Sequence, residues 1–322
     1  MKPTVARLVV FAPNWLGDAV MALPAIADVR RAFPDASLTV AARPSIAPLF
    51  TMVPGIDGML TLDKHTGPMS FETALLLPNS FHAALRVWRA GVPERWGYRT
   101  DWRGPLLTRA IAQPSRGHQV EYYQHLVRAV GCPSVSGTPQ VILSDELRAT
   151  AIRELHSAGW DGRRPLVALA PGAAYGGAKR WPPASFAELA RTLAVDGMQS
   201  ILVGGRGDFA VAREIESALG TDVVLNLMGT DLPTLAALLG TCRALVSNDS
   251  GAMHLGAAVG VRVTAVFGPT DERVTRPAGS GHAVLTHSVW CRPCGMRECP
   301  IDHRCMRGVG VDRVVGAVRQ ML

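Results

Sequence analysis

Three absences narrow the class of protein that this 322-residue sequence can encode. Lys2 and Arg7 flank only a short apolar segment, and no apolar run reaches the length of a membrane span, so we expect neither a signal peptide nor a transmembrane helix. No intact Gly-x-Gly-x-x-Gly follows the first predicted strand, which weakens the hypothesis of a dinucleotide-dependent dehydrogenase. Charged residues make up only 18% of the chain against 48% hydrophobic residues, as is typical of a well-packed globular protein. We therefore predict a cytoplasmic globular protein.

Lysine is absent from residues 86–128, although this segment carries most of the net positive charge. Its eight arginines stand against three acidic residues and contribute +5 (eight minus three) of the chain's formal charge of +7. A guanidinium suits carboxylate and phosphate recognition better than an ammonium does, because it can donate two hydrogen bonds at once. We interpret the segment as a binding surface for an anionic small molecule or an anionic membrane, with a solvated basic face as the alternative. No nucleic-acid motif accompanies the charge, so we expect no nucleic-acid partner. The arginines are Arg86, Arg89, Arg95, Arg99, Arg103, Arg109, Arg116 and Arg128.

The chain is long enough for two domains with separate cores. Predicted strands and helices alternate in two successive series, which is typical of parallel sheets covered by helices. We therefore predict an α/β protein with two Rossmann-like domains that face each other across a cleft. The domains are expected at residues 1–155 and 156–322, with the last helix, Asp312–Leu322, able to pack back on the first domain.

The sequence predicts the approximate bounds of the strands and helices in each series. In the first we predict strands at Leu8–Ala12, Leu38–Ala42 and Ala74–Leu77, a helix at Asp18–Phe33, and a helical pattern through residues 81–130. In the second we predict strands at Leu166–Ala170, Ser200–Val203, Val223–Leu225, Ala244–Ser247 and Arg262–Phe267, with helices at 145–158, 183–195, 208–219, 232–239 and 252–259. A capping box, Ser185 to Glu188, is expected at the helix that follows Pro182.

The loop that follows the predicted strand Ala244–Ser247 is suited to binding an anion. Ligands of open parallel sheets bind at the carboxyl ends of the strands, and a helix N-terminus offers unpaired N–H groups and a positive dipole end. Here Ser250 adds a hydroxyl, Gly251 allows close approach to the backbone, and His254 lies in the first turn of the helix. The alternative is a helix that Asp249 or Ser250 merely caps.

Two further loops complete a coherent site. The glycine-rich loop 171–182 carries Lys179 and Arg180, which together with the helix N-terminus are suited to holding a diphosphate. Asp18 lies at the start of a helix in the first domain, where a helix-cap role is the alternative to a base. A base and a diphosphate site fit group transfer from a nucleotide-diphosphate donor, with leaving-group charge stabilised by the protein. A non-catalytic binding protein on the same scaffold is the competing hypothesis, but such a protein has no need of Asp18 opposite Lys179.

The chain resembles the heptosyltransferases of lipopolysaccharide inner-core synthesis, a family of inverting glycosyltransferases with the two-domain GT-B fold. The resemblance covers nearly the whole chain and looks closest to the heptosyltransferase II branch. It rests on Asn14-Trp-Leu-Gly-Asp18, Leu77-Pro-Asn-Ser-Phe81, the segment 171–182 and Asn248-Asp-Ser-Gly-Ala-Met-His254. It implies a donor of ADP-heptose (ADP-L-glycero-β-D-manno-heptose) and an acceptor that is the first inner-core heptose on Kdo-lipid A, at the cytoplasmic face of the inner membrane. Another sugar donor within the same family is an alternative.

The resemblance also implies roles for individual residues. Asp18 matches the catalytic base and Lys179 the lysine that stabilises the donor diphosphate. The expected donor-binding residues are Lys179, Arg180, Asp208, Asp249, Ser250, Gly251 and His254, with Asp208 directed at the ribose. The acceptor is polyanionic, so we assign to it Asn14 together with Arg95, Arg99 and Arg103 of the arginine-rich segment. We expect no cofactor and no metal ion in the reaction, and an anionic membrane surface as a partner.

Four cysteines are crowded into fifteen residues near the carboxyl terminus, with His303 among them. In a cytoplasmic protein such crowding favours metal over a disulfide, but the spacing matches no standard zinc finger. A structural zinc ion, reduced thiols and a redox disulfide all remain open. The four are Cys291, Cys294, Cys299 and Cys305.

Overall fold

The computed structural model describes residues 5–62, 69–115, 117–135, 137–219 and 223–322. They form two compact units, unit 1 (Met1–Ile142) and unit 2 (Leu143–Leu322). The division lies earlier than the predicted boundary at 155, because helix α5 (Asp145–Ser157) packs against helix α8 (Leu232–Thr241) of unit 2. Ala151 and Leu155 of α5 are buried, and Leu143 lies against Gly240.

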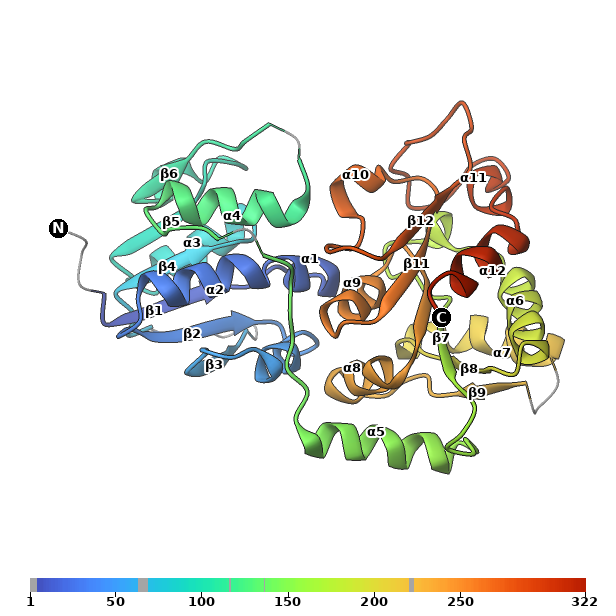
Figure 1. Ribbon diagram of the computed structural model, residues 1–322. Helices are drawn as coiled ribbons and strands as arrows, with labels where there is room; N and C mark the ends of the chain where they lie inside the picture. The colour runs from blue at the N-terminus through green and yellow to red at the C-terminus, as the bar shows by residue number, and fades with distance from the viewer. Residues whose placement is uncertain (1–4, 63–68, 116, 136, 220–222) are drawn as a thin grey trace. The chain divides into compact units, whose positions relative to one another are not determined.

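Unit 1 is built on a six-stranded, all-parallel sheet in the order β3-β2-β1-β4-β5-β6 (Figure 1). Helices α2 and α4 pack against each other, and α3 packs against β4 and β5. The core is aliphatic and aromatic, with Val9, Phe11 and Leu76 from the central strands meeting Val87 of α3. The strands are β1 (Arg7–Phe11), β2 (Ser37–Ala42), β3 (Gly58–Thr61), β4 (Thr73–Leu76), β5 (Glu94–Tyr98) and β6 (Arg109–Ile111). The helices are α1 (Leu16–Met21), α2 (Leu23–Ala32), α3 (Phe81–Arg89) and α4 (Gln119–Ala129), with 3₁₀ turns η1 (Ala47–Met52) and η2 (Gly104–Leu106).

Two predictions for unit 1 are wrong in detail. The helix expected at Asp18–Phe33 is broken at Ala22 into α1 and α2, because Pro24 has no N–H to donate and its ring excludes a continuous helix. The helical pattern expected through residues 81–130 contains strands β5 and β6 between its two helices. The fully buried Trp96 and Tyr98 make β5 an interior strand, a role that the arginines around them conceal in the sequence.

Unit 2 repeats the architecture of unit 1 with a parallel sheet in the order β12-β11-β10-β7-β8-β9. Its strands are β7 (Leu166–Ala170), β8 (Gln199–Leu202), β9 (Val224–Asn226), β10 (Ala244–Asn248), β11 (Arg262–Phe267) and β12 (Ala283–Thr286). Besides α5 and α8, its helices are α6 (Pro183–Val195), α7 (Phe209–Leu219), α9 (Gly251–Ala258), α10 (Glu272–Thr275), α11 (Arg304–Arg307) and α12 (Val311–Arg319), with turns η3 (Gly177–Lys179) and η4 (Arg206–Asp208).

The last helix, α12, packs within its own unit. It lies against α6 and against strands β10, β11 and β12. Its buried face, Val314, Val315 and Val318, joins the core that contains Trp181 and Phe186. The apolar face of α12 is therefore used in unit 2, rather than on the first domain as the sequence allowed.

The predicted capping box at the start of α6 is wrong. The helix begins at Pro183, after Pro182, and Ser185 already lies inside its first turn, where its N–H donates to the Pro182 carbonyl over 3.0 Å. Proline suits the first helical position because the N–H it lacks would have no partner there. The two prolines therefore set the start of α6.

Both sheets share one feature that positions a site. In each, the strand order reverses direction between two central neighbours, β1 and β4 in unit 1 and β7 and β10 in unit 2. Ligands of such sheets bind outside the carboxyl ends of the strands at this reversal. The loops concerned are residues 12–15 and 77–80 in unit 1, and 171–182 and 249–250 in unit 2.

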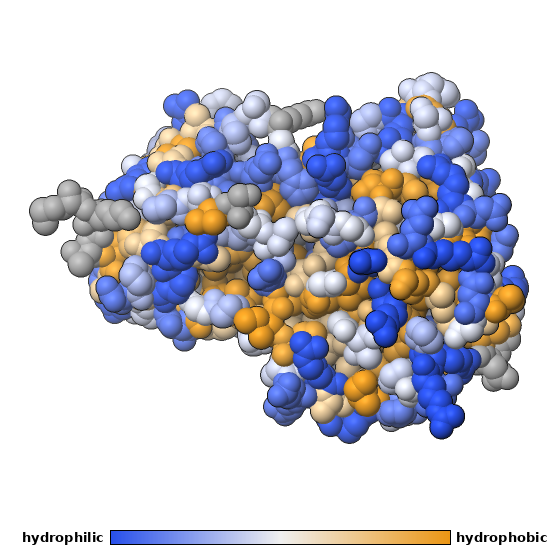
Figure 2. Space-filling model, in the orientation of Figure 1, coloured by the Kyte–Doolittle hydropathy of each residue, from blue (hydrophilic) through white to orange (hydrophobic). Residues whose placement is uncertain are grey.

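Among the residues that the structure places, no helix is long and apolar enough to cross a membrane. On the face shown in Figure 2, hydrophilic side chains are interspersed with smaller hydrophobic areas.

Candidate active site

Lys179 and Asp249 form an ion pair at the strand reversal of unit 2. Lys179 Nζ donates to Asp249 Oδ2 over 2.6 Å, and Thr270 Oγ1 donates to the same oxygen over 2.6 Å. The side chains are 12% and 5% exposed, so the pair is well shielded from water. The Tyr175 ring lies under the ammonium, with 4.7 Å between Nζ and the ring centroid. An ammonium has three N–H donors and Asp249 uses one of them, so the pair fixes Lys179 without exhausting its capacity for an anion.

The N-terminus of α9 lies beside this pair, because β10 runs directly through Asp249 and Ser250 into the helix. Ser250 occupies the N-cap position in an extended conformation, and its hydroxyl lies 3.1 Å from the Ser247 hydroxyl. Within the described residues the Ser250 side chain makes no capping hydrogen bond, so the structure does not support the alternative that Ser250 merely caps the helix. His254 is buried in the helix. The backbone N–H groups of the first turn and the Lys179 ammonium thus converge on one edge of the sheet.

Asn248 holds both ends of the lysine loop, a role that was not predicted from the sequence, although its motif was. Its Nδ2 donates to the Pro171 carbonyl over 2.7 Å, and its Oδ1 accepts from the Trp181 N–H over 3.0 Å. Trp181 itself is fully buried and donates from Nε1 to the Val309 carbonyl over 2.8 Å, which makes it a packing anchor. A buried amide that satisfies two backbone groups is a precise positioning device.

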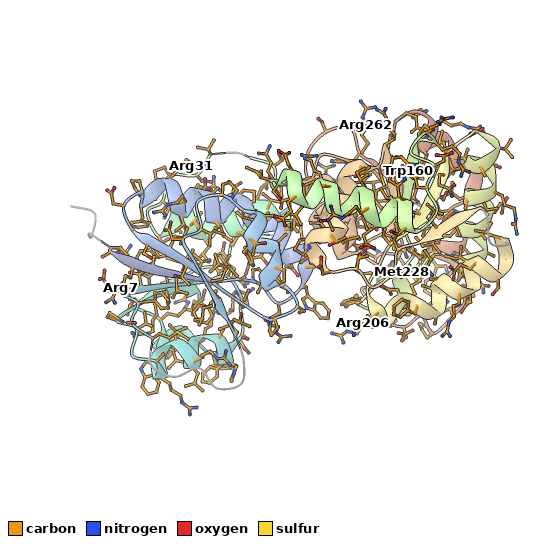
Figure 3. All side chains as sticks on the ribbon, turned by 90° about the horizontal axis from the view of Figure 1, so that it is seen from below. Arg7, Arg31, Trp160, Arg206, Met228 and Arg262 are labelled. Carbon is orange, nitrogen blue, oxygen red and sulfur yellow. The ribbon has the colours of Figure 1, made fainter. Side chains whose placement is uncertain are left out.

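Arg180 and Asp208 lie close together but are differently engaged. Arg180 is exposed, and its Nη2 lies 3.9 Å from Asp208 Oδ1. The other Asp208 oxygen accepts from the Gly205 N–H over 3.1 Å and so caps turn η4, while Arg206 of the same turn points outward (Figure 3). A Cβ at Gly172 would lie 2.2 Å from Asp208 Cγ, so a larger residue there would displace the Asp208 carboxylate. The ribose contact predicted for Asp208 stays a prediction.

The cysteine-rich segment contacts the lysine loop, which the sequence did not indicate. The Glu298 carboxylate accepts from the Gly177 N–H over 3.0 Å, and the Arg297 carbonyl accepts from the Ala178 N–H over 2.9 Å. Tyr175 Oη donates to the Gly295 carbonyl over 2.8 Å. We call residues 291–299 the bracing segment, because these bonds hold the loop that carries Lys179.

All six cysteines of the described chain are free thiols. Burial first, and then the neighbouring Cys291 and Cys299 thiols, raise the pKa of Cys305. Across the described ranges no group of three or more His, Cys, Asp or Glu side chains is arranged to hold a metal ion. The bonds of the bracing segment to the lysine loop are made by backbone groups and by Tyr175 and Glu298, and they involve no thiol.

In unit 1, Asp18 lies in the first turn of α1, just beyond the carboxyl end of β1. The N-cap of α1 is Trp15, so the helix-cap alternative for Asp18 is wrong. Tyr123 Oη donates to Asp18 Oδ1 over 3.4 Å. Burial first, and then the charge of Asp18, raise the pKa of Tyr123, which keeps the phenol protonated as a donor. Asp18 is half-buried.

The three arginines assigned to the acceptor do not form one surface. Arg95 donates to the carbonyls of Val92, Pro93 and Leu106 over 2.6–2.8 Å. Arg103 is fully buried and donates to the carbonyls of Tyr98 and Pro78, and burial lowers its pKa to about 10. Only Arg99 of the three is exposed. The assignment of Arg95 and Arg103 to the acceptor is therefore corrected, since their guanidiniums bind the protein's own backbone; Arg116 lies outside the described residues.

The fold and the site together define a class of protein. The structure of Escherichia coli ADP-heptose lps heptosyltransferase II matches this chain with a TM-score of 0.84, at 27% identity and with 98% of each chain covered. E. coli heptosyltransferase WaaC with ADP matches at a TM-score of 0.74 and 17% identity, covering 98% of this chain and all of the other. The fold is the GT-B type of glycosyltransferases, as the sequence predicted.

Sequence similarity narrows the class to one family. Residues 59–304 match glycosyltransferase family 9 (heptosyltransferase). The lipopolysaccharide heptosyltransferase 2 of Escherichia coli (strain K12) is 30% identical over 296 residues, which cover 84% of this chain and 85% of that protein. The lipooligosaccharide heptosyltransferase 2 of Haemophilus ducreyi (strain 35000HP) is 28% identical over 346 residues, covering 98% and 99%. The chain belongs to glycosyltransferase family 9 and is a glycosyltransferase.

Proposed function

We propose that this glycosyltransferase moves heptose from ADP-L-glycero-β-D-manno-heptose to the first inner-core heptose on Kdo-lipid A, with inversion at the anomeric carbon. The observation that carries the proposal is the shielded Lys179–Asp249 pair beside the N-terminus of α9, at the strand reversal of unit 2. In addition, this chain is 30% identical to a protein named lipopolysaccharide heptosyltransferase 2.

In this proposal unit 2 binds the donor. The diphosphate lies against Lys179, Arg180 and the N–H groups that follow Ser250, so positive charge meets the leaving group where its negative charge grows. Gly251 admits the phosphate to the backbone, and His254 supports the first turn of α9. Asp208 is assigned to the ribose. Since these groups supply the electrostatic stabilisation, the proposal includes no metal ion and no cofactor.

Unit 1 binds the acceptor and supplies the base. The acceptor hydroxyl oxygen attacks the anomeric carbon as its proton passes to Asp18, while the bond between that carbon and the β-phosphate oxygen breaks and ADP leaves. Tyr123 donates to one Asp18 oxygen and so helps to orient the carboxylate. Asn14, on the loop before Asp18, is assigned to the acceptor.

The proposed acceptor is a lipid, so the reaction takes place at the cytoplasmic face of the inner membrane, with the protein bound peripherally. The chain's formal charge of +7 favours attraction to an anionic surface.

The test is a transfer assay with purified protein, ADP-heptose and heptosylated Kdo-lipid A, followed by mass spectrometry of the lipid. We expect a product heavier by one heptose and release of ADP. Kdo-lipid A that lacks the first heptose is the matched control and should not react. Transfer from ADP-glucose or ADP-mannose at a rate equal to that from ADP-heptose would contradict the assigned donor.

A further inference from the structure

Unit 1 contains a pocket of about 640 Å³ at its own strand reversal. The pocket opens at the carboxyl ends of β1, β2 and β4 and at the start of α3, where ligands of such sheets bind. Its size falls within the roughly 300–1,000 Å³ of small-molecule sites. Asn14 lines it from the loop that leads to Asp18, so an occupant would be held next to the proposed base.

The polar lining of this pocket is positive. Arg43 reaches it from the end of β2 and Arg86 from α3, with Ser80 and His82 between them at the helix N-terminus. Among the described residues that line it, none is Asp or Glu. Two guanidiniums suit a carboxylate or a phosphate, to which arginine can donate paired hydrogen bonds.

The rest of the lining is apolar. Phe11, Ala12 and Leu62 contribute to the wall, and Pro44 and Pro78 lie at the ends of their strands. An apolar wall with a few charged groups at one side matches a sugar ring that presents C–H groups on one face and an acid on its edge. It does not match a polyphosphate chain, which would demand cations along its whole length.

Two of the three arginines assigned to the acceptor from the sequence lie elsewhere in unit 1. The guanidiniums of Arg95 and Arg103 donate to backbone carbonyls of unit 1. Arg43 is exposed and Arg86 half-exposed, and both line the pocket. Position at the pocket, rather than density of arginine along the chain, therefore selects the anion-binding residues.

We propose that this pocket is the subsite for a negatively charged sugar of the acceptor, in which Arg43 and Arg86 bind the carboxylate or phosphate of that sugar. The inference rests on the proposed function and adds to it the residues that recognise the acceptor. Binding the anion beside Asn14 fixes the distance between the accepting hydroxyl and Asp18, so the pocket positions the acceptor for transfer.

The test uses three variants: Arg43→Gln, Arg86→Gln and the double variant that carries both changes. The control is Arg89→Gln, which changes an exposed arginine of helix α3 that does not line the pocket. The readouts are the acceptor KM, the KM for ADP-heptose and the Kd for ADP. One charged hydrogen bond lost from each single variant should raise the acceptor KM about ten-fold or more, with the donor constants unchanged. Arg89→Gln should behave like the parent.

Modified acceptors separate the two sources of negative charge and do not depend on the variants folding. Acceptor with its sugar carboxylates reduced to alcohols, and acceptor with its phosphates removed, are each given to the parent protein and to the double variant. Whichever group the pocket binds, its removal should raise the KM of the parent and leave that of the double variant unchanged, since the partner is already gone.

Three outcomes would overturn the proposal: an unchanged acceptor KM in the double variant, a loss of ADP affinity in it, or a parent enzyme indifferent to both modifications. These outcomes are distinct from failure of the proposed function, in which the parent protein would transfer no heptose to any acceptor.

Discussion

At the scale of single residues, Asp18 has the most specific expected role. It lies in the first turn of α1, where Tyr123 donates to one of its oxygens. Asp18→Asn keeps the size and one hydrogen-bond acceptor but removes the base. We expect kcat to fall by roughly 10²–10⁴, the usual contribution of general-base catalysis, while the Kd for ADP stays unchanged.

The control for this variant is Asp35→Asn, since Asp35 is exposed on the loop between α2 and β2. Steady-state kinetics with saturating ADP-heptose provide the measurement. Turnover of Asp18→Asn near the parent rate would remove Asp18 from the role of base.

Lys179 carries a second prediction at the residue scale. Its ammonium is held by Asp249 at the site assigned to the diphosphate, so Lys179→Ala removes a charged donor and leaves Asp249 without its cation. We expect the Kd for ADP to rise about ten- to hundred-fold, which corresponds to one hydrogen bond between charged groups, and kcat to fall with it. Isothermal titration with ADP measures the first effect. If Lys179→Ala bound ADP like the parent, the diphosphate would have to bind elsewhere.

The sequence made Asp18, Lys179 and the loop that begins at Asn248 candidates, because glycine-rich loops and helix starts after buried strands are visible as patterns, and the structure pairs Lys179 with Asp249 of that loop. It did not distinguish Arg103, whose guanidinium donates to backbone carbonyls, from an arginine that could bind a ligand. Burial comes from contacts between distant segments, and the charge of a residue says nothing about them.

At the scale of elements, Arg103 joins the end of β5 to the loop after β4. It is fully buried, it donates to the carbonyls of Tyr98 and Pro78, and its Nη2 has no hydrogen-bond partner among the described side chains and backbone. Arg103→Ala would remove one donor from each of those carbonyls, leave Tyr98 with the bond from the Thr100 N–H, and open a cavity. We expect the free energy of unfolding to fall by about 2–4 kcal/mol.

Urea unfolding followed by circular dichroism measures this change, with Arg99→Ala, an exposed neighbour, as the control expected to stay within about 0.5 kcal/mol of the parent. Equal stability of the two variants would show that Arg103 does not tie the elements together. A variant in which Arg95, Arg99 and Arg103 are all replaced would therefore measure a loss of folding stability rather than a loss of acceptor binding.

The bracing segment carries a prediction that separates loop position from chemistry. Glu298 is exposed, yet its carboxylate accepts from the Gly177 N–H in the loop that carries Lys179. Glu298→Ala removes one of the three bonds that hold this loop and leaves the side chains assigned to the phosphates unchanged. We expect the KM for ADP-heptose to rise roughly two- to ten-fold, in keeping with one hydrogen bond of modest net energy.

Glu188→Ala, at an exposed position on α6, is the matched control and should not change the KM. An unchanged KM in Glu298→Ala would mean that the lysine loop holds its position without the bracing segment.

The elements of unit 2 were largely predictable. Strands β7 and β11 and helix α6 have the predicted bounds, because each is a continuous apolar or amphipathic run between clear breaks. Strands β5 and β6 were missed, since β5 mixes Glu94 and Arg95 with aromatic residues and β6 is an edge strand of three residues. Short strands that depend on neighbours for burial leave no periodic signal of their own.

At the scale of the whole molecule, the repeated strand order gives one chain two places suited to ligands. Each unit has its own strand reversal, and the two reversals carry different chemistry: a lysine beside a helix N-terminus in unit 2, and a pocket lined by arginine in unit 1. The sequence predicted two sheets from two alternating series, but strand order comes from tertiary packing. The site of the pocket could therefore be located only once the order was known.

The molecule's net charge leads to a prediction about its location. A formal charge of +7 attracts the protein to a surface of anionic lipid, by roughly 1 kcal/mol for each basic residue close to that surface. We expect the protein to sediment with vesicles that contain phosphatidylglycerol and to remain in solution with vesicles of phosphatidylcholine alone. Raising the salt from about 0.1 M to about 1 M shortens the screening length from roughly 10 Å to roughly 3 Å, so binding should fall steadily over that range. Equal binding to both kinds of vesicle, or binding insensitive to salt, would show that exposed charge does not bring this protein to a membrane.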